Sequence, residues 1–253
     1  MAVPEGGNAM LQSLTQAAHG TNRDAMRGAM PTREEVCNRI FEVGVIPALR
    51  VESPEDALFV AEALTEAGIP IVEVASNVPG GANIVSYVVK HAPGTIVGAG
   101  NINTEVAARQ CLDAGAKFLT SAALVLEVVK LAAKEDVAVI PGAFTATEIV
   151  AARNAGSDFV KVIPCDAGGG SGYIRSLKSA LPDIPMIAAG GVTQQTALSI
   201  VAAGATALGI GRDLLPADAI RLREARRIQE LARRFLSFVD NGRIEAAGRN
   251  NLL

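Results

Sequence analysis

The chain of 253 residues has little of several residue types, and each shortage excludes a class of protein. It has no tryptophan, 4% aromatic residues, two histidines and three cysteines, Cys37, Cys111 and Cys165. The cysteines are far apart, odd in number and never in a CxxC pair, which argues against a disulfide framework. No cluster has the spacing of zinc ligands. Free thiols of this kind are typical of a reducing compartment, so we expect a cytoplasmic protein.

Long apolar runs and an excess of positive charge are also missing. Nowhere do about 18 apolar residues follow one another, and residues 1–30 contain no apolar stretch of the length that a signal peptide needs. The net charge of −3 argues against nucleic acid or an anionic membrane as the main partner. We therefore expect a small-molecule partner, with no nucleic acid and no membrane.

What the chain has instead is a repeated unit. Hydrophobic residues make up 49% of the chain, and short apolar runs alternate with amphipathic segments. A first helix is expected after Thr32, which is placed to be its N-cap, with an apolar stripe at Val36, Ile40 and Val43. We then predict strands at 45–50, 69–76, 95–100, 117–122, 137–142, 158–164, 185–191 and 207–211, and helices near 53–67, 80–91, 104–114, 123–134, 145–155, 171–181, 194–203 and 216–239.

Eight strands that alternate with eight helices predict one α/β domain, a (β/α)8 TIM barrel. A doubly wound open sheet is the alternative, but its GxGxxG fingerprint is missing after the first strand. Four helices end in Ala-Gly, which places the glycines for the left-handed position after a helix: Gly68, Gly115, Gly156 and Gly204. We expect a flexible N-terminal extension over 1–30 with a short helix near 8–18, a barrel over 31–239, and a C-terminal tail over 240–253. The charges from Arg223 onward are expected to mark a solvated helix face.

Two charged residues interrupt the apolar strands. The stretch "SDFVKVIPCD" places Lys161 inside a strand, and "IVEVAS" does the same with Glu73. Reactive groups of a TIM barrel lie at the C-terminal ends of its strands. A buried structural ion pair without chemistry is one explanation. The other is an amine that burial keeps partly neutral, which attacks a ketone to form an imine while the carboxylate moves the protons.

Several motifs in barrel order resemble one family. They are "VEVASNVP" (72–79), "IVGAGNI" (96–102), "VIPGAFTATE" (139–148), "VKVIP" (160–164) and "AGGVT" (189–193). Together they resemble the class I 2-keto-3-deoxy-6-phosphogluconate / 4-hydroxy-2-oxoglutarate aldolase family over roughly residues 33 to 225. The resemblance implies that Lys161 forms the Schiff base, that Glu73 is the general acid and base, that no metal or other cofactor is needed, and that the chain forms a homotrimer.

The resemblance also implies substrate contacts. Arg50 ends the first strand and would face an anion, unless it forms a surface salt bridge. Asn77 is similar to the branch of the family that acts on 2-keto-3-deoxy-6-phosphogalactonate. Asn101 and Ser121 would help to hold the keto-acid carboxylate. Thr145 is a further candidate, with a rival role as the N-cap of the following helix.

Phosphate binding requires backbone N–H groups, and glycine-rich loops follow the seventh and eighth strands. The candidates are Gly190, Gly191, Gly209 and Gly211, which could also be tight turns without a ligand. Arg212 stands where the family commonly has serine, and would either strengthen anion binding or fill the pocket. The glycine-rich loop 166–172 is expected to be a mobile lid. Cys165 is expected to be a packing residue, because no histidine lies in an active-site loop to activate it.

The resemblance implies a lyase that cleaves a 2-keto-3-deoxy-6-phospho sugar acid to pyruvate and glyceraldehyde 3-phosphate. Two alternatives stay open at this point. One is the same chemistry on 4-hydroxy-2-oxoglutarate or another unphosphorylated 2-keto acid, and the other is a phosphosugar-binding barrel without catalysis.

Overall fold

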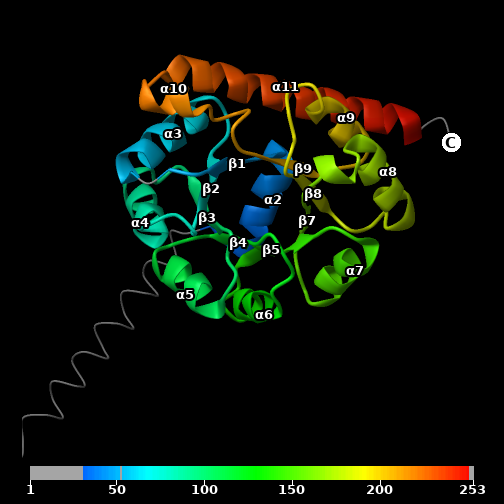
Figure 1. Ribbon diagram of the computed structural model, residues 1–253, viewed down its shortest axis with the longest axis horizontal. Coiled ribbons are helices and arrows are strands. Elements are labelled where there is room, and N and C mark those ends of the chain that lie inside the picture. The colour runs from blue at the N-terminus through cyan, green and yellow to red at the C-terminus, as the bar shows by residue number, and fades with distance from the viewer. Residues whose placement is uncertain (1–30, 52, 251–253) are drawn as a thin grey trace, which may run out of the picture. The chain divides into compact units, whose positions relative to one another are not determined.

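The strands form one parallel sheet that curls into a barrel (Figure 1). The computed structural model describes residues 31–51 and 53–250. The order of strands in the sheet is β5-β4-β3-β2-β1-β9-β8-β7-β6, and every pairing is parallel. Their bounds are β1 Val45–Leu49, β2 Ile71–Ala75, β3 Ile96–Gly100, β4 Phe118–Thr120, β5 Ala138–Ile140, β6 Gly142–Ala143, β7 Val160–Val162, β8 Met186–Ala189 and β9 Ala207–Ile210.

A proline divides the fifth strand of the barrel. Pro141 separates β5 from β6, and its nitrogen carries no hydrogen to donate to the sheet. β5 pairs with β4, whereas β6 pairs with β7, where Gly142 lies opposite Lys161. The two ends of the strand order are therefore two halves of one strand, and the predicted eight-stranded α/β barrel is confirmed.

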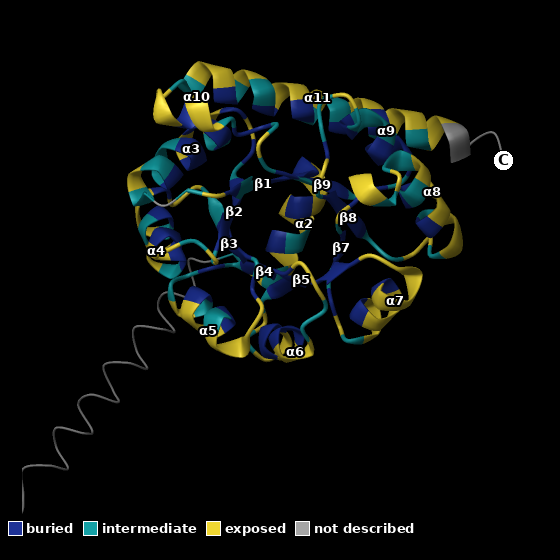
Figure 2. Cartoon of the chain, in the orientation of Figure 1, coloured by how far each residue is buried: buried dark blue, intermediate teal, exposed yellow. Residues whose placement is uncertain are grey.

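Helices form a layer outside the strands (Figure 1), with their inner faces buried and their outer faces exposed (Figure 2). Their positions agree with the predicted alternation of strands and helices, except near the C-terminus. Their bounds are α2 Arg33–Val43, α3 Pro54–Glu66, α4 Gly81–His91, α5 Glu105–Asp113, α6 Leu126–Lys134, α7 Ala146–Asn154, α8 Ser171–Ala180, α9 Ala197–Ala202, α10 Ala217–Arg221 and α11 Ala225–Asn250, with a 3-10 helix at Asp166–Gly168. None of the described helices combines the length and the apolar character needed to cross a membrane.

The C-terminal prediction of one helix over 216–239 is wrong. Two helices, α10 and α11, meet at a corner where Arg223 has a left-handed φ of 55°. α11 then continues to Asn250 through most of the expected tail. It packs closely on α9. Gly242 allows this approach, since a Cβ added there would lie only 2.7 Å from Val201 Cβ. The expected extension of residues 1–30, with its helix near 8–18, lies outside the described residues.

The four Ala-Gly helix ends adopt the predicted conformation. Gly68 has φ 97°, its N–H donates to Thr65 O, and the N–H of Ile69 donates to Leu64 O at 2.9 Å. This is the Schellman arrangement, which satisfies the last carbonyls of a helix. The same pair of bonds recurs at the other three glycines of the set. Each helix therefore stops at a defined point and the chain turns directly into the next strand.

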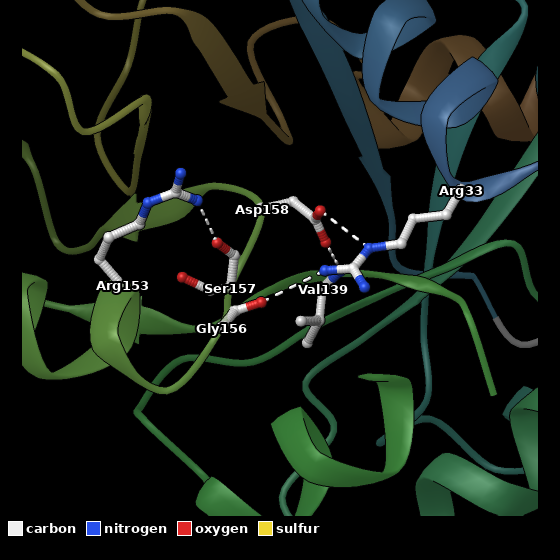
Figure 3. A network of polar contacts seen from close by, with 6 residues as sticks. All are labelled: Arg33, Val139, Arg153, Gly156, Ser157 and Asp158. Carbon is white, nitrogen blue, oxygen red and sulfur yellow. Dashed lines mark hydrogen bonds and ion pairs between the residues drawn. The ribbon is translucent and has the colours of Figure 1, made fainter. Parts of the chain in front are cut away.

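Helix α2 lies at the end of the barrel where the strands begin, because only Gly44 separates it from the start of β1. It buries Val36, Ile40 and Val43, so the predicted stripe is confirmed. A polar network holds this end together (Figure 3). Asp158 accepts hydrogen bonds from Arg33 Nε and from the Val139 backbone, both at 2.9 Å. This end of the barrel contributes stability, and the opposite end is free for chemistry.

Candidate active site

The two charged residues predicted inside the barrel meet there. Lys161 on β7 and Glu73 on β2 are each 7% exposed, and Lys161 Nζ lies 3.0 Å from Glu73 Oε2. The same amine donates to Thr120 Oγ1 on β4 at 2.7 Å. Successive side chains of a strand point to opposite faces, so the apolar neighbours Val160 and Val162 pack outward when Lys161 points inward. The prediction that the amine and the carboxylate share one site is therefore confirmed in geometry.

Room for the carboxylate depends on the next strand. Gly100, at the end of β3, has no side chain at the place where the Glu73 carboxylate lies, and a Cβ there would be 2.1 Å from Glu73 Oε1. Any larger residue would push the carboxylate away from Lys161. Gly100 is thus a positioning residue that sequence reasoning did not single out.

Thr120 was also missed. It is 1% exposed and bonds directly to the amine. Its sequence signal is a hydroxyl at the end of the apolar run "KFLT", which is weak because threonine is common in strands. Buried polar groups of this kind need partners, and here the partner is the candidate nucleophile.

The pair lies at the base of a cavity of about 1060 Å³. The cavity is lined by residues at the C-terminal ends of the strands and the loops that follow them. Seven further predicted residues line it: Arg50, Asn101, Gly190, Gly191, Gly209, Gly211 and Arg212. The cavity extends from the amine over the loops after β8, β9 and β1, which are neighbours in the sheet.

Three predicted contacts do not line the cavity. Asn77 contacts a residue that does line the cavity, because its Oδ1 accepts a hydrogen bond from Asn101 Nδ2 at 3.0 Å. Ser121 is buried, and its hydroxyl donates to Ala123 O at 2.6 Å. Thr145 caps α7 in a capping box with Glu148, so its rival role as an N-cap is confirmed. Two backbone N–H groups donate to the Glu148 carboxylate and lower its pKa.

The backbone conformation of the loop after β8 explains why two of its residues are glycines. Gly190 and Gly191 have φ values of 76° and 84°, which favour glycine. A Cβ at Gly191 would lie 2.1 Å from Asp166 Cβ, so the loop 166–172 packs against it. Asp166 N also donates to Gly190 O at 3.0 Å. The mobility of this loop stays a prediction.

Sequence reasoning also missed charged residues at the cavity mouth: Asp56, Asp213, Arg221 and Arg223. Arg223 forms an ion pair with Asp56 at 2.7 Å and lies 4.8 Å from the ring centre of Phe59. Arg223 is exposed, as expected for a solvated face, and it also lines the cavity. The charge pattern of a helix surface does not indicate that the chain between α10 and α11 lies at the mouth of the cavity.

Cys165 lies three residues after β7, the strand that carries Lys161, but has the character of a packing residue. It is buried, and burial, aided by the charge of Asp166, raises the pKa of its thiol to about 11. A thiol with such a pKa is a poor nucleophile near neutral pH. Within the described residues, no group of three or more histidine, cysteine, aspartate or glutamate side chains is placed to hold a metal ion.

Known proteins with similar sequences and structures point in the same direction. The family model described as KDPG and KHG aldolase matches residues 36–231. A probable 2-dehydro-3-deoxy-6-phosphogalactonate aldolase of Rhizobium meliloti (strain 1021) is 34% identical over 176 residues, which are 69% of this chain and 82% of the relative. The KHG/KDPG aldolase of Escherichia coli (strain K12) is 27% identical over 189 residues, which are 75% of this chain and 89% of the relative.

A solved structure shows the same architecture. It is the KDPG aldolase from Legionella pneumophila with pyruvate captured at low pH as a covalent carbinolamine intermediate. It superposes with a TM-score of 0.73 at 25% identity, over 78% of this chain and 96% of the other. With the family model matching most of the barrel and a lysine–glutamate pair at its centre, the chain belongs to the KDPG and KHG aldolase family, whose members are lyases.

Proposed function

We propose that the protein is a class I aldolase that cleaves a 2-keto-3-deoxy-6-phospho sugar acid to pyruvate and glyceraldehyde 3-phosphate. One observation carries the proposal. A buried primary amine, Lys161 Nζ, lies within hydrogen-bonding distance of both Glu73 and Thr120 at the base of an open cavity. A purely structural pair would need no cavity in front of it.

The first step is formation of an imine. Glu73, at 3.0 Å, takes one proton from the Lys161 ammonium, and the resulting neutral amine attacks the C2 ketone of the substrate. A second proton passes from the nitrogen to the new C2 oxygen, which becomes a hydroxyl group. The Glu73 carboxyl group then returns its proton to the C2 hydroxyl, which leaves as water, so that a protonated imine and the Glu73 carboxylate remain. Thr120 holds the amine in place for the attack at 2.7 Å.

The second step breaks the bond between C3 and C4. Glu73, directly or through one water, removes the proton from the C4 hydroxyl, and the electron pair of the C3–C4 bond moves into the protonated imine. Glyceraldehyde 3-phosphate leaves, and an enamine of pyruvate remains on Lys161. Protonation of the enamine at C3 and hydrolysis of the imine release pyruvate and restore the amine. No electrons are gained or lost overall.

The substrate branch that we favour is phosphogalactonate. The relative named for that substrate is 34% identical to the chain, whereas the KHG/KDPG aldolase is 27% identical. Asn77 stands in the segment "EVASNVP" and is bonded to the cavity residue Asn101. We propose that the Asn77–Asn101 pair and Arg50 contact the sugar-acid end of the substrate, and that Gly209 and Gly211 let the substrate approach the backbone. Ser121 and Thr145 act indirectly, by shaping the loops after β4 and β6.

The experiment is borohydride trapping with pyruvate, followed by peptide mass spectrometry. We expect a reduced adduct on the peptide that contains Lys161, and none with Lys161→Met. A folded wild-type protein that gives no adduct would rule out Schiff-base catalysis. Steady-state cleavage of the two epimeric phosphorylated acids, and of 4-hydroxy-2-oxoglutarate, then ranks the substrates, and the highest kcat/KM is expected for the phosphogalactonate compound.

We infer a homotrimer and a cytoplasmic location. Val106 on α5, Leu126 on α6 and Val150 on α7 are exposed on three consecutive helices, and an exposed apolar surface of this kind is typical of subunit contacts. Light scattering should give about three times the 26.1 kDa chain mass, and a monomer would exclude the trimer. The described cysteines are all free, and cell fractionation tests the location.

A further inference from the structure

Two backbone N–H groups of the loop after β8 are already hydrogen-bonded within the chain and do not point at a ligand. The Thr193 N–H donates to Thr196 Oγ1 at 3.0 Å, and the Gln194 N–H donates to Asp213 Oδ2 at 3.1 Å. These two backbone N–H groups, which precede α9, therefore already have acceptors on Thr196 and Asp213. Asp213 also brings a carboxylate to the cavity wall, where it repels an anion.

Arginines surround the same end of the cavity. Arg50, Arg212, Arg221 and Arg223 line it, opposed by the carboxylates of Asp56 and Asp213, while Lys161 and Glu73 balance each other at the base. The described lining residues therefore carry an excess of two positive charges, although the whole chain carries −3. A cavity with this sign of charge attracts a substrate that carries both a carboxylate and a phosphate.

Three of these arginines are free to bind a ligand, and one of them, Arg50, is assigned above to the sugar-acid end of the substrate. Arg212 and Arg221 have exposed side chains and no ion pair or hydrogen bond with any other described residue. Arg223, by contrast, is held by Asp56 and donates to Glu55 O at 3.0 Å. It fixes the corner after α10 against α3, and thereby holds Arg221, two residues earlier, at the cavity mouth.

We propose that Arg221 on α10 and Arg212 after β9 bind the terminal phosphate of the substrate through their side chains, in place of loop amides. The inference rests on the proposed function and adds Arg221, a residue outside the β-strand loops, as a specificity determinant. Guanidinium groups bind phosphate with paired, charge-assisted hydrogen bonds, so two of them can supply the contacts that the two occupied amides do not make.

The test measures KM for cleavage of the phosphorylated substrate and of its unphosphorylated counterpart. With Arg221→Ala, we expect the ratio of the phosphorylated to the unphosphorylated KM to rise at least about tenfold, because one charge-assisted contact is lost. Arg221→Lys should recover part of the preference, since it keeps the charge but not the paired geometry. Asp213→Asn should lower KM for the phosphorylated substrate. Arg226→Ala, an exposed arginine that does not line the cavity, is the matched control.

Three kinetic results would overturn the proposal: an unchanged KM ratio with Arg221→Ala, an equal rise of both KM values with that variant, or a higher KM for the phosphorylated substrate with Asp213→Asn. The last of these would mean that loop amides positioned by Asp213 hold the phosphate. Calorimetric binding of glyceraldehyde 3-phosphate gives a second readout without catalysis, and equal affinity of wild type and Arg221→Ala would also overturn it. Pyruvate carries no phosphate. A failure to trap pyruvate with borohydride would therefore contradict only the proposed aldolase function, and not the proposed phosphate contacts.

Discussion

Replacement of Gly100 by alanine tests whether the place of the Glu73 carboxylate sets the rate. The new Cβ would lie 2.1 Å from Glu73 Oε1 and 2.6 Å from its Cδ. Ordinary contact needs about 3.4 Å, so the carboxylate must move by about 1.3 Å. The obstacle is a flexible side chain rather than backbone, so we expect the barrel to fold.

The displacement is large relative to the contact that it affects. Lys161 Nζ and Glu73 Oε2 are 3.0 Å apart, and a shift of this size breaks a hydrogen bond or bends it severely. A positioned acid–base group contributes about 10²–10⁴-fold to a rate. Because the displaced carboxylate is still present, we expect the lower end of that range, a fall in kcat of about 10²-fold, or about 3 kcal/mol of barrier.

The assay is steady-state release of pyruvate, combined with thermal unfolding to confirm that the variant is folded. Gly94→Ala is the matched control, because it precedes the same strand and a Cβ there meets nothing within 4 Å. Glu73→Gln should be at least as slow as Gly100→Ala. A folded Gly100→Ala variant with kcat within about threefold of wild type would refute the assignment of Glu73 as the proton carrier.

Three further predictions follow from the described contacts. Thr120→Val removes the 2.7 Å partner of Lys161 at nearly constant volume, so single-turnover imine formation with pyruvate should slow about tenfold, and an unchanged rate would show that the hydroxyl does not position the amine. Asp158→Ala removes the acceptor of Arg33 and of a backbone N–H at the opposite end of the barrel, so the melting temperature should fall by several degrees, about 2–4 °C for each kcal/mol lost; a loss of kcat in the folded variant would contradict the structural role. Burial raises the pKa of Cys165 to about 11, so its alkylation at pH 8 should be at least about tenfold slower in the native protein than after unfolding. Because this pKa is raised in the folded state, the stability that it contributes is present below about pH 9 and is lost as pH rises toward 11, and rapid native labelling of the Cys165 peptide would contradict the burial.

Local patterns predicted the elements well where one residue type dictates the backbone. The Ala-Gly helix ends are an example: Gly68 adopts the left-handed conformation that the sequence predicts. The break at Pro141 was not predicted, since the sequence indicated one continuous strand over 137–142, although the missing N–H of proline explains it. The corner at Arg223 could not be predicted, because arginine rarely adopts φ 55° and does so here while held by Asp56 and Glu55.

The candidate site divides along the same line. Lys161 and Glu73 could be found because a charge in an apolar strand is costly without a partner. Gly100 and Thr120 could not, since a glycine or a threonine at a strand end has many ordinary explanations. The importance of Gly100 depends on the space that it leaves for the Glu73 carboxylate on the neighbouring strand. The importance of Thr120 depends on its 2.7 Å contact with Lys161, which lies 41 residues later in the sequence.

The sequence by itself determined the alternation of strands and helices, the family, and the two candidate catalytic residues, because periodicity, helix ends and charges inside apolar strands are local properties of the chain. Only the tertiary structure decided what surrounds them. Closure of the barrel brings Lys161 on β7 within hydrogen-bonding distance of Glu73 on β2 and Thr120 on β4. The arrangement of the last two helices brings Arg221 and Arg223 to the cavity mouth. Contacts between residues so far apart depend on packing, which no local pattern records.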